Sequence, residues 1–76
     1  MKKHRIEYET PIDALVAVSK RLSAFEERYH LSSEDFFHKY SSGENDDTAD
    51  FVEWANNYRH YLAIRSELER ELRHVA

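Results

Sequence analysis

Residues 51–75 read FVEWANNYRHYLAIRSELERELRHV and set the architecture that the rest of the chain must fit. Large side chains recur through this segment at alternating spacings of three and four residues, which is the period of one face of an α-helix. The row consists of Phe51, Trp54, Tyr58, Tyr61, Arg65, Leu68, Leu72 and Val75, with Ala55 and Leu62 beside it. The spacing predicts one long amphipathic helix, about 40 Å in length at about 1.5 Å per residue.

Arg65 interrupts this apolar row, and two interpretations of it stay open. Its aliphatic stem can lie along an apolar surface while its guanidinium reaches water, which is the more common arrangement. Alternatively, the side chain points inward, pairs with a carboxylate and fixes the register between two helices.

The residues before the long helix predict a loop and a short helix. An acidic loop covers residues 44–47, after which either Asp47 or Thr48 can cap the long helix. Ser32 is the predicted cap of the short helix, with Asp35 following it as in a capping box. This helix carries Phe36, Phe37 and Tyr40, and Leu31 before the cap can pack onto Phe36. We expect it to end at Ser41-Ser42-Gly43, because glycine readily adopts the left-handed conformation of a helix terminus.

A second amphipathic helix precedes these elements. Thr10 suits its N-cap, Pro11 suits its first position, and Asp13 places negative charge in the first turn. Its apolar row is Leu15, Val18, Leu22, Phe25 and Tyr29. The helix is predicted to end at about Tyr29.

These elements predict an all-α fold in which a short helix connects an antiparallel pair of long amphipathic helices. Residues 10–76 form one helical domain, and residues 1–9 form a basic N-terminal arm. The third helix outruns the first, and the chain holds ten aromatic residues (four Phe, five Tyr and one Trp). A helix pair leaves part of that apolar surface uncovered. We expect completion as a dimeric helical bundle, with the N-terminal arm or another protein as the alternative cover.

Composition narrows the classes of function. The chain has 76 residues, enough for one domain, and no Cys, which excludes disulfides and thiolate zinc sites. A net charge of −4 argues against nucleic-acid binding, which needs a basic face. No apolar run is long enough to span a membrane, and no signal-peptide segment follows the basic residues 1–5. We expect a cytoplasmic protein.

The motifs present in the sequence favour a protein that is not an enzyme and needs no cofactor. There is no Cys nucleophile, glycine-rich phosphate loop or Gly-x-Ser-x-Gly motif. A metal site is the alternative, because acid-x-x-His pairs occur at Glu27/His30, Asp35/His38 and Glu71/His74. Acidic residues also recur at Glu44, Asp47, Asp50 and Glu53, where a helix N-terminus attracts negative charge in any case. Glu27/His30 and Glu71/His74 do not belong to the apolar rows. The preferred interpretation is that these pairs lie on solvent-exposed helix faces.

A partner-binding surface is the prediction that the aromatic residues support best. Tyr, Trp and Arg are enriched at the residues that dominate binding energy in protein interfaces. The predicted partner-binding residues are Asp50, Phe51, Glu53, Trp54, Tyr58 and Tyr61. For Phe51 and Trp54 a purely structural place in the core is the competing interpretation.

One set of motifs resembles a known group of proteins. It comprises Phe36-Phe37-His38-Lys39-Tyr40, Gly43-Glu44, Asp50-Phe51-Val52-Glu53-Trp54-Ala55 and Tyr58. This pattern resembles short prokaryotic proteins that are typically encoded beside a small toxin gene and regarded as antitoxins. The resemblance covers roughly residues 8–70. It implies that the chain binds and neutralises a cognate toxin, often an RNA-cleaving one.

The sequence thus predicts a protein-binding helical module, antitoxin-like, with another protein as its partner. A structural homodimer is the alternative, and a metal-binding helical protein is a more distant one.

Overall fold

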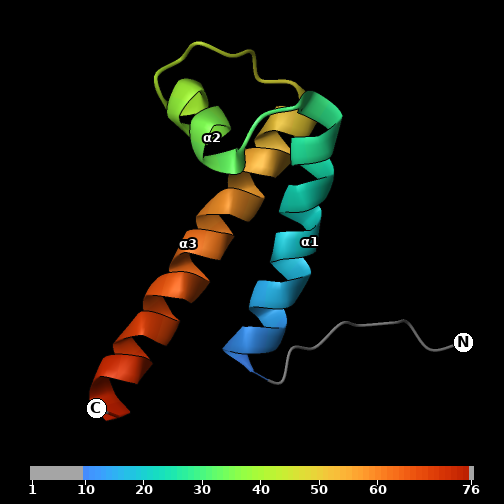
Figure 1. Cartoon of the computed structure of the whole chain (residues 1–76). Helices are drawn as coiled ribbons and strands as arrows, with labels where there is room; N and C mark the ends of the chain where they lie inside the picture. The colour runs from blue at the N-terminus through green and yellow to red at the C-terminus, as the bar shows by residue number, and fades with distance from the viewer. Residues whose placement is uncertain (1–9, 76) are drawn as a thin grey trace, which may run out of the picture.

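Three α-helices make up the computed structural model, which describes residues 10–75 and the side chains of residues 10–73. Helix α1 spans Pro11–Tyr29, α2 spans Ser33–Ser41 and α3 spans Ala49–Val75 (Figure 1). The described part of the chain contains no strand. The predicted all-α class, with two long helices and a short connecting one, is therefore confirmed. The predicted N-terminal arm, residues 1–9, lies outside the described residues.

Each helix begins at a hydroxyl side chain that accepts a hydrogen bond from the first turn. Thr10 Oγ1 lies 3.1 Å from the backbone nitrogen of Asp13, and Ser32 Oγ lies 3.1 Å from that of Asp35. Both predicted caps are confirmed. For α3 the cap is Thr48, whose Oγ1 accepts from the N–H of Phe51 at 3.2 Å.

Asp47, the other cap candidate for α3, lies beside Tyr40 instead. The hydrogen bond between the two side chains is the main reason why the pKa of Tyr40 is raised. Asp47 therefore connects the loop to α2, while Thr48 starts α3.

The two turns between the helices use left-handed residues. Gly43 has φ of 79° just after α2, as predicted. His30 closes α1 with φ of 55° and ψ of 48°, although the sequence offers no glycine there. Its backbone N–H bonds to the carbonyl of Glu26. His is among the non-glycine residues that adopt this conformation more often than most.

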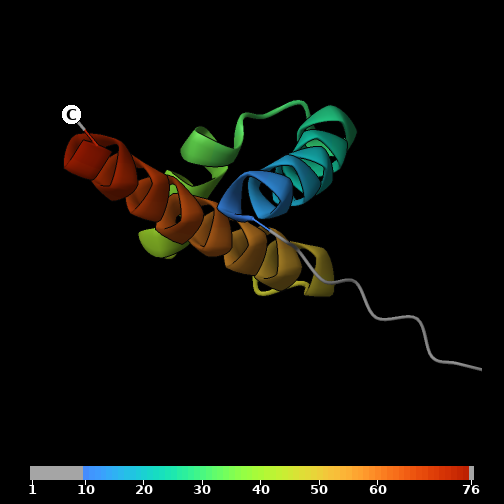
Figure 2. The ribbon, with the colours of Figure 1, turned by 90° about the horizontal axis from the view of Figure 1, so that it is seen from below.

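Helices α1 and α3 run antiparallel, and α2 packs across the N-terminal part of α3 at the connected end (Figure 1). Seen from below, the C-terminal end of α3 extends past α1 (Figure 2). The lengths explain this overhang, because α3 has 27 residues and α1 has 19. Among the described residues, no helix combines the length and the apolar character that crossing a bilayer requires.

The core consists of two clusters along the hairpin. At the connected end, Leu22, Phe36, Trp54 and Ala55 are buried together. Nearer the open end, Ala14 and Val18 of α1 close around Ile64 of α3. The first cluster joins all three helices, and the second joins α1 to α3 alone.

Trp54 organises the first cluster. It is fully buried, and its ring stacks on Phe36 with centroids 3.9 Å apart and planes within 2°. Phe25 stacks on it from α1 at 5.4 Å. The indole N–H donates to the buried hydroxyl of Ser33 at 2.9 Å, so the polar atom of this large side chain is satisfied inside the core.

The predicted row on α3 is wrong at Arg65 and Leu72, whereas Leu68 is half-buried against the second cluster as predicted. Ile64 is buried although it is not in the row, whereas Leu72 is 69% exposed and the side chain of Arg65 is 55% exposed. Ala55 and Ile64 are separated by about two and a half helical turns, so they point to opposite sides of α3. The buried face turns around the helix because α2 and α1 cover its first half, and α1 alone covers the middle.

Candidate interaction surface

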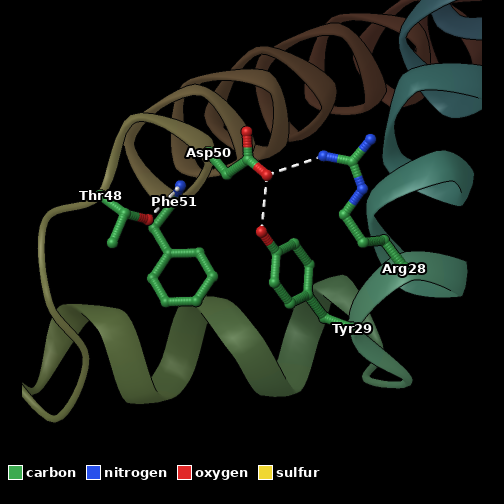
Figure 3. Close-up of polar contacts among 5 residues, drawn as sticks. All are labelled: Arg28, Tyr29, Thr48, Asp50 and Phe51. Carbon is green, nitrogen blue, oxygen red and sulfur yellow. Dashed lines mark hydrogen bonds and ion pairs between the residues drawn. The ribbon is translucent and has the colours of Figure 1, made fainter.

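Asp50 joins the end of α1 to the start of α3. One carboxylate oxygen, Oδ2, accepts hydrogen bonds from Arg28 Nη1 at 2.8 Å and from the hydroxyl of Tyr29 at 2.6 Å (Figure 3). Both donors come from the last turn of α1, while Asp50 lies in the first turn of α3. These bonds occupy this oxygen within the chain.

The charges in this contact shift all three titrations in the direction that favours it. The hydrogen bond from Tyr29, followed by that from Arg28, lowers the pKa of Asp50. The bond to Asp50 raises the pKa of Tyr29 and that of Arg28. The ionised carboxylate, the neutral phenol and the guanidinium are thus the stable set at neutral pH.

Phe51 and Trp54 occupy the junction of the three helices. Trp54 is 0% exposed, in agreement with its interpretation as a core residue. Phe51 is half-buried, and its ring centroid lies 5.3 Å from those of both Tyr29 and Phe36. Of the predicted partner-binding residues, these two support the fold directly.

Tyr58 and Tyr61 line a groove of about 340 Å³ between the helices. Its walls come from all three helices and the cap before α2: Ser19, Leu22, Ser23, Glu26, Ser32, Ser33, Glu34, Tyr58, Tyr61 and Arg65. The two tyrosine rings stack with centroids 5.8 Å apart and planes within 22°. Both are half-buried, so each keeps part of its ring open to the groove.

Charged groups stand at both ends of the tyrosine pair. Glu26 Oε2 accepts a hydrogen bond from the backbone N–H of Ser33 at 2.9 Å and so caps α2 from α1. Burial, followed by the charge of Glu34, raises the pKa of Tyr58. Arg65 lies 5.9 Å above the ring of Tyr61, and its Nε is 3.7 Å from Glu69.

Glu53 lies elsewhere. It is exposed and lines a second hollow of about 270 Å³ with Asp50 and with Arg21, Ala24, Phe25 and Arg28 of α1. At about 100° per residue, Arg21, Ala24 and Arg28 occupy the face of α1 opposite Ser19, Ser23 and Glu26. The structure therefore divides the predicted partner-binding residues: Asp50 and Glu53 on one side, Tyr58 and Tyr61 on the other, and Trp54 between them.

Exposed apolar side chains continue the groove toward the open end of the hairpin. Ile12 and Val16 of α1 are 59% and 50% exposed, and Leu72 of α3 is 69% exposed. Ile12 and Val16 share a helix face with Ser19 and Ser23, and Leu72 shares one with Tyr61 and Arg65. We call this surface the groove face: Ile12, Val16, Ser19 and Ser23 of α1 with Tyr58, Tyr61, Arg65 and Leu72 of α3.

Sequence reasoning missed several residues of this surface. The spacing of Ile12, Val16, Ser19 and Ser23 is helical, but two serines made the row inconspicuous beside the apolar row of the same helix. Glu26 and Glu34 gave no signal, because what distinguishes them is a tertiary position beside Tyr58.

Two of the acid-x-x-His pairs, Glu27/His30 and Asp35/His38, have described side chains, and they do not converge. Among the described residues, no group of three or more His, Asp or Glu side chains lies close enough together to hold a metal ion.

Comparison with known protein families, curated proteins and solved structures gave no match to this chain.

Proposed function

We propose that this chain is a protein-binding helical module and that the groove face is its contact surface. The observation that supports this most directly is the exposure of Ile12, Val16 and Leu72 beside an open groove. Because these three side chains are 50–69% exposed, a partner that covers one of them gains roughly half to two-thirds of the about 1.5–3 kcal/mol that full burial contributes. Two half-buried tyrosines and an arginine at the centre supply the residue types that dominate binding energies.

The partner within this proposal is a small toxin, and the module works in the cytoplasm as its antitoxin. The support is the resemblance of residues 36–58 to antitoxin-like proteins, together with a net charge of −4. A negative module and the basic surface of an RNA-cleaving toxin attract each other at long range, which speeds association.

Co-expression with the product of the adjacent gene tests the proposal. We expect a stable complex and relief of any growth arrest that the adjacent gene causes. Val16→Glu should weaken the complex at least tenfold, about 1.4 kcal/mol, because it places a charge in the contact surface. Ala63→Glu is the matched control, since Ala63 is exposed on the opposite side of α3. Equal affinities for the two variants would remove the groove face as the contact surface.

A structural homodimer is the second candidate. Rows at spacings of three and four on two adjacent antiparallel helices are half of a four-helix assembly, and a second copy would supply the other half. Sedimentation over a concentration series distinguishes the candidates. A dimer that Val16→Glu dissociates, with no complex formed by the adjacent gene product, supports the homodimer.

A further inference from the structure

The inner end of the groove has a chemistry different from that of its open end. Glu26 and Glu34 stand there beside the ring of Tyr58, close to the start of α2. Neither carboxylate forms an ion pair with a basic side chain in the part of the chain that the structure describes. Glu26 accepts one hydrogen bond from Ser33, and a carboxylate can accept about four.

The tyrosines add an aromatic wall to these acids. Tyr58 is stacked on Tyr61 and is backed by Phe37, whose centroid lies 5.1 Å away. Ring faces attract cations, and the attraction is stronger where water is partly excluded. Tyr58 meets that condition, since it is half-buried and lines the groove with Glu34. The same burial raises its pKa. Two carboxylates beside tyrosine rings are a suitable environment for an ammonium or guanidinium group.

Arg65 limits where a cation can bind along the groove. Its guanidinium lies over Tyr61 and interacts with Glu69, so positive charge already occupies the middle of the groove face. A second cation is repelled there and attracted to the inner end, where both uncompensated acids lie. The groove face is thus negative at its inner end, positive in the middle at Arg65, and apolar toward the open end at Ile12, Val16 and Leu72.

We propose that the inner end of the groove binds a lysine or arginine side chain from an amphipathic helix of the partner, a step that rests on the proposed function. The charge complementarity of Glu26 and Glu34 identifies the basic residue. The exposed Ile12, Val16 and Leu72 identify the apolar residues that accompany it.

Helix geometry fixes their spacing. Glu26 and Val16 are about 15 Å apart along α1, and a partner helix lying along the groove covers that distance in about ten residues. Ile12 lies 14 residues from Glu26, about 21 Å along α1. The basic residue at position i is therefore accompanied by apolar residues near i+10 or i+11 and near i+14, or at the same spacings in the opposite direction.

A defined helical peptide library, displayed on phage and panned on the full chain, tests this inference. We expect enriched sequences to carry Lys or Arg at one position and apolar residues about ten and fourteen positions away. Glu34→Gln should weaken the best peptide five- to tenfold, and the loss should shrink in 0.5 M NaCl because salt screens the pair. A peptide in which Met replaces the basic residue should bind the wild type and Glu34→Gln with equal affinity. Glu53→Gln is the control, as an exposed carboxylate outside the groove.

The outcomes separate this inference from the function on which it rests. Peptides that lose binding on Val16→Glu, but carry no preferred basic residue and ignore Glu34→Gln, overturn the inference and leave the groove face intact. A panning in which no enriched peptide responds to Val16→Glu overturns both.

Discussion

Trp54 shows how one side chain can connect every element of a small fold. It contacts α1 through Phe25, and α2 through Phe36 and through the hydrogen bond to Ser33, the first residue of α2. Its burial could be anticipated from the sequence as one of two interpretations. The bond to Ser33 could not, because it joins residues 21 positions apart whose meeting depends on how α2 docks.

Trp54→Ala should unfold the protein. Truncating a buried tryptophan typically costs about 3–5 kcal/mol, and a domain of this size rarely has more than about 3–5 kcal/mol in total. Ser33→Ala should cost less, about 1–3 kcal/mol, by leaving the indole N–H without a partner. Urea unfolding followed by circular dichroism measures both. A midpoint for Trp54→Ala equal to that of the wild type would contradict the central role of this residue.

The Asp50 contact predicts a dependence of stability on pH. The pKa of Asp50 is lowered in the folded state, so its contribution is full above the unfolded value of about 3.9 and is lost as pH falls through the lower folded value. The thermal midpoints of the wild type and Asp50→Asn should therefore differ at pH 7 and converge below about pH 4. A gap of constant size from pH 7 to pH 2.5 would show that the carboxylate charge does not matter.

The helix boundaries show which features of the fold are determined by residues close together in the sequence. The sequence predicted the roles of Thr10, Ser32 and Gly43, because a cap or a left-handed glycine acts on its immediate neighbours. It did not predict the burial of Ile64 or the left-handed conformation of His30. The burial of Ile64 depends on where α1 crosses α3, and the φ of His30 depends on how α2 turns back onto the hairpin. The groove acids escaped prediction for the same reason.

The start of α3 offers a test of one such local rule. Thr48→Ala removes the acceptor for the N–H of Phe51 and should destabilise the protein by about 1 kcal/mol. Asp46→Ala, in the same loop and exposed, should change stability by less than about 0.5 kcal/mol. Chemical denaturation of the two variants makes the comparison. A larger loss of stability from Asp46→Ala than from Thr48→Ala would show that Thr48 is not the cap of α3.

In the whole molecule, the residues that stabilise the fold and those available for association lie at different ends of the helical hairpin. The aromatic cluster lies where the three helices meet, whereas the three most exposed large apolar side chains of the described residues, Ile12, Val16 and Leu72, lie toward the other ends of α1 and α3. Substitutions at the first end should affect folding, and substitutions at the second should affect association. The apolar surface that the sequence predicted in excess is present, although the residues that carry it differ from those of the predicted aromatic row.

Leu72→Gln tests this separation. Leu72 is 69% exposed and Gln has a similar helix propensity, so the free energy of unfolding should change by less than about 0.5 kcal/mol. Binding of the partner, or self-association, should weaken measurably. Parallel denaturation and sedimentation experiments give the two quantities. A loss of stability without a loss of association would place Leu72 in the core instead.

The position of the single tryptophan also has a practical consequence. Its intrinsic fluorescence comes from the enclosed junction of the three helices, so the emission maximum reports whether α2 is docked. A ligand that covers only Ile12, Val16 and Leu72 should leave the emission wavelength unchanged. A ligand that displaces α2 from the other two helices should shift the emission maximum to the red. The molecule thus carries an internal optical label that distinguishes surface docking from remodelling of the fold.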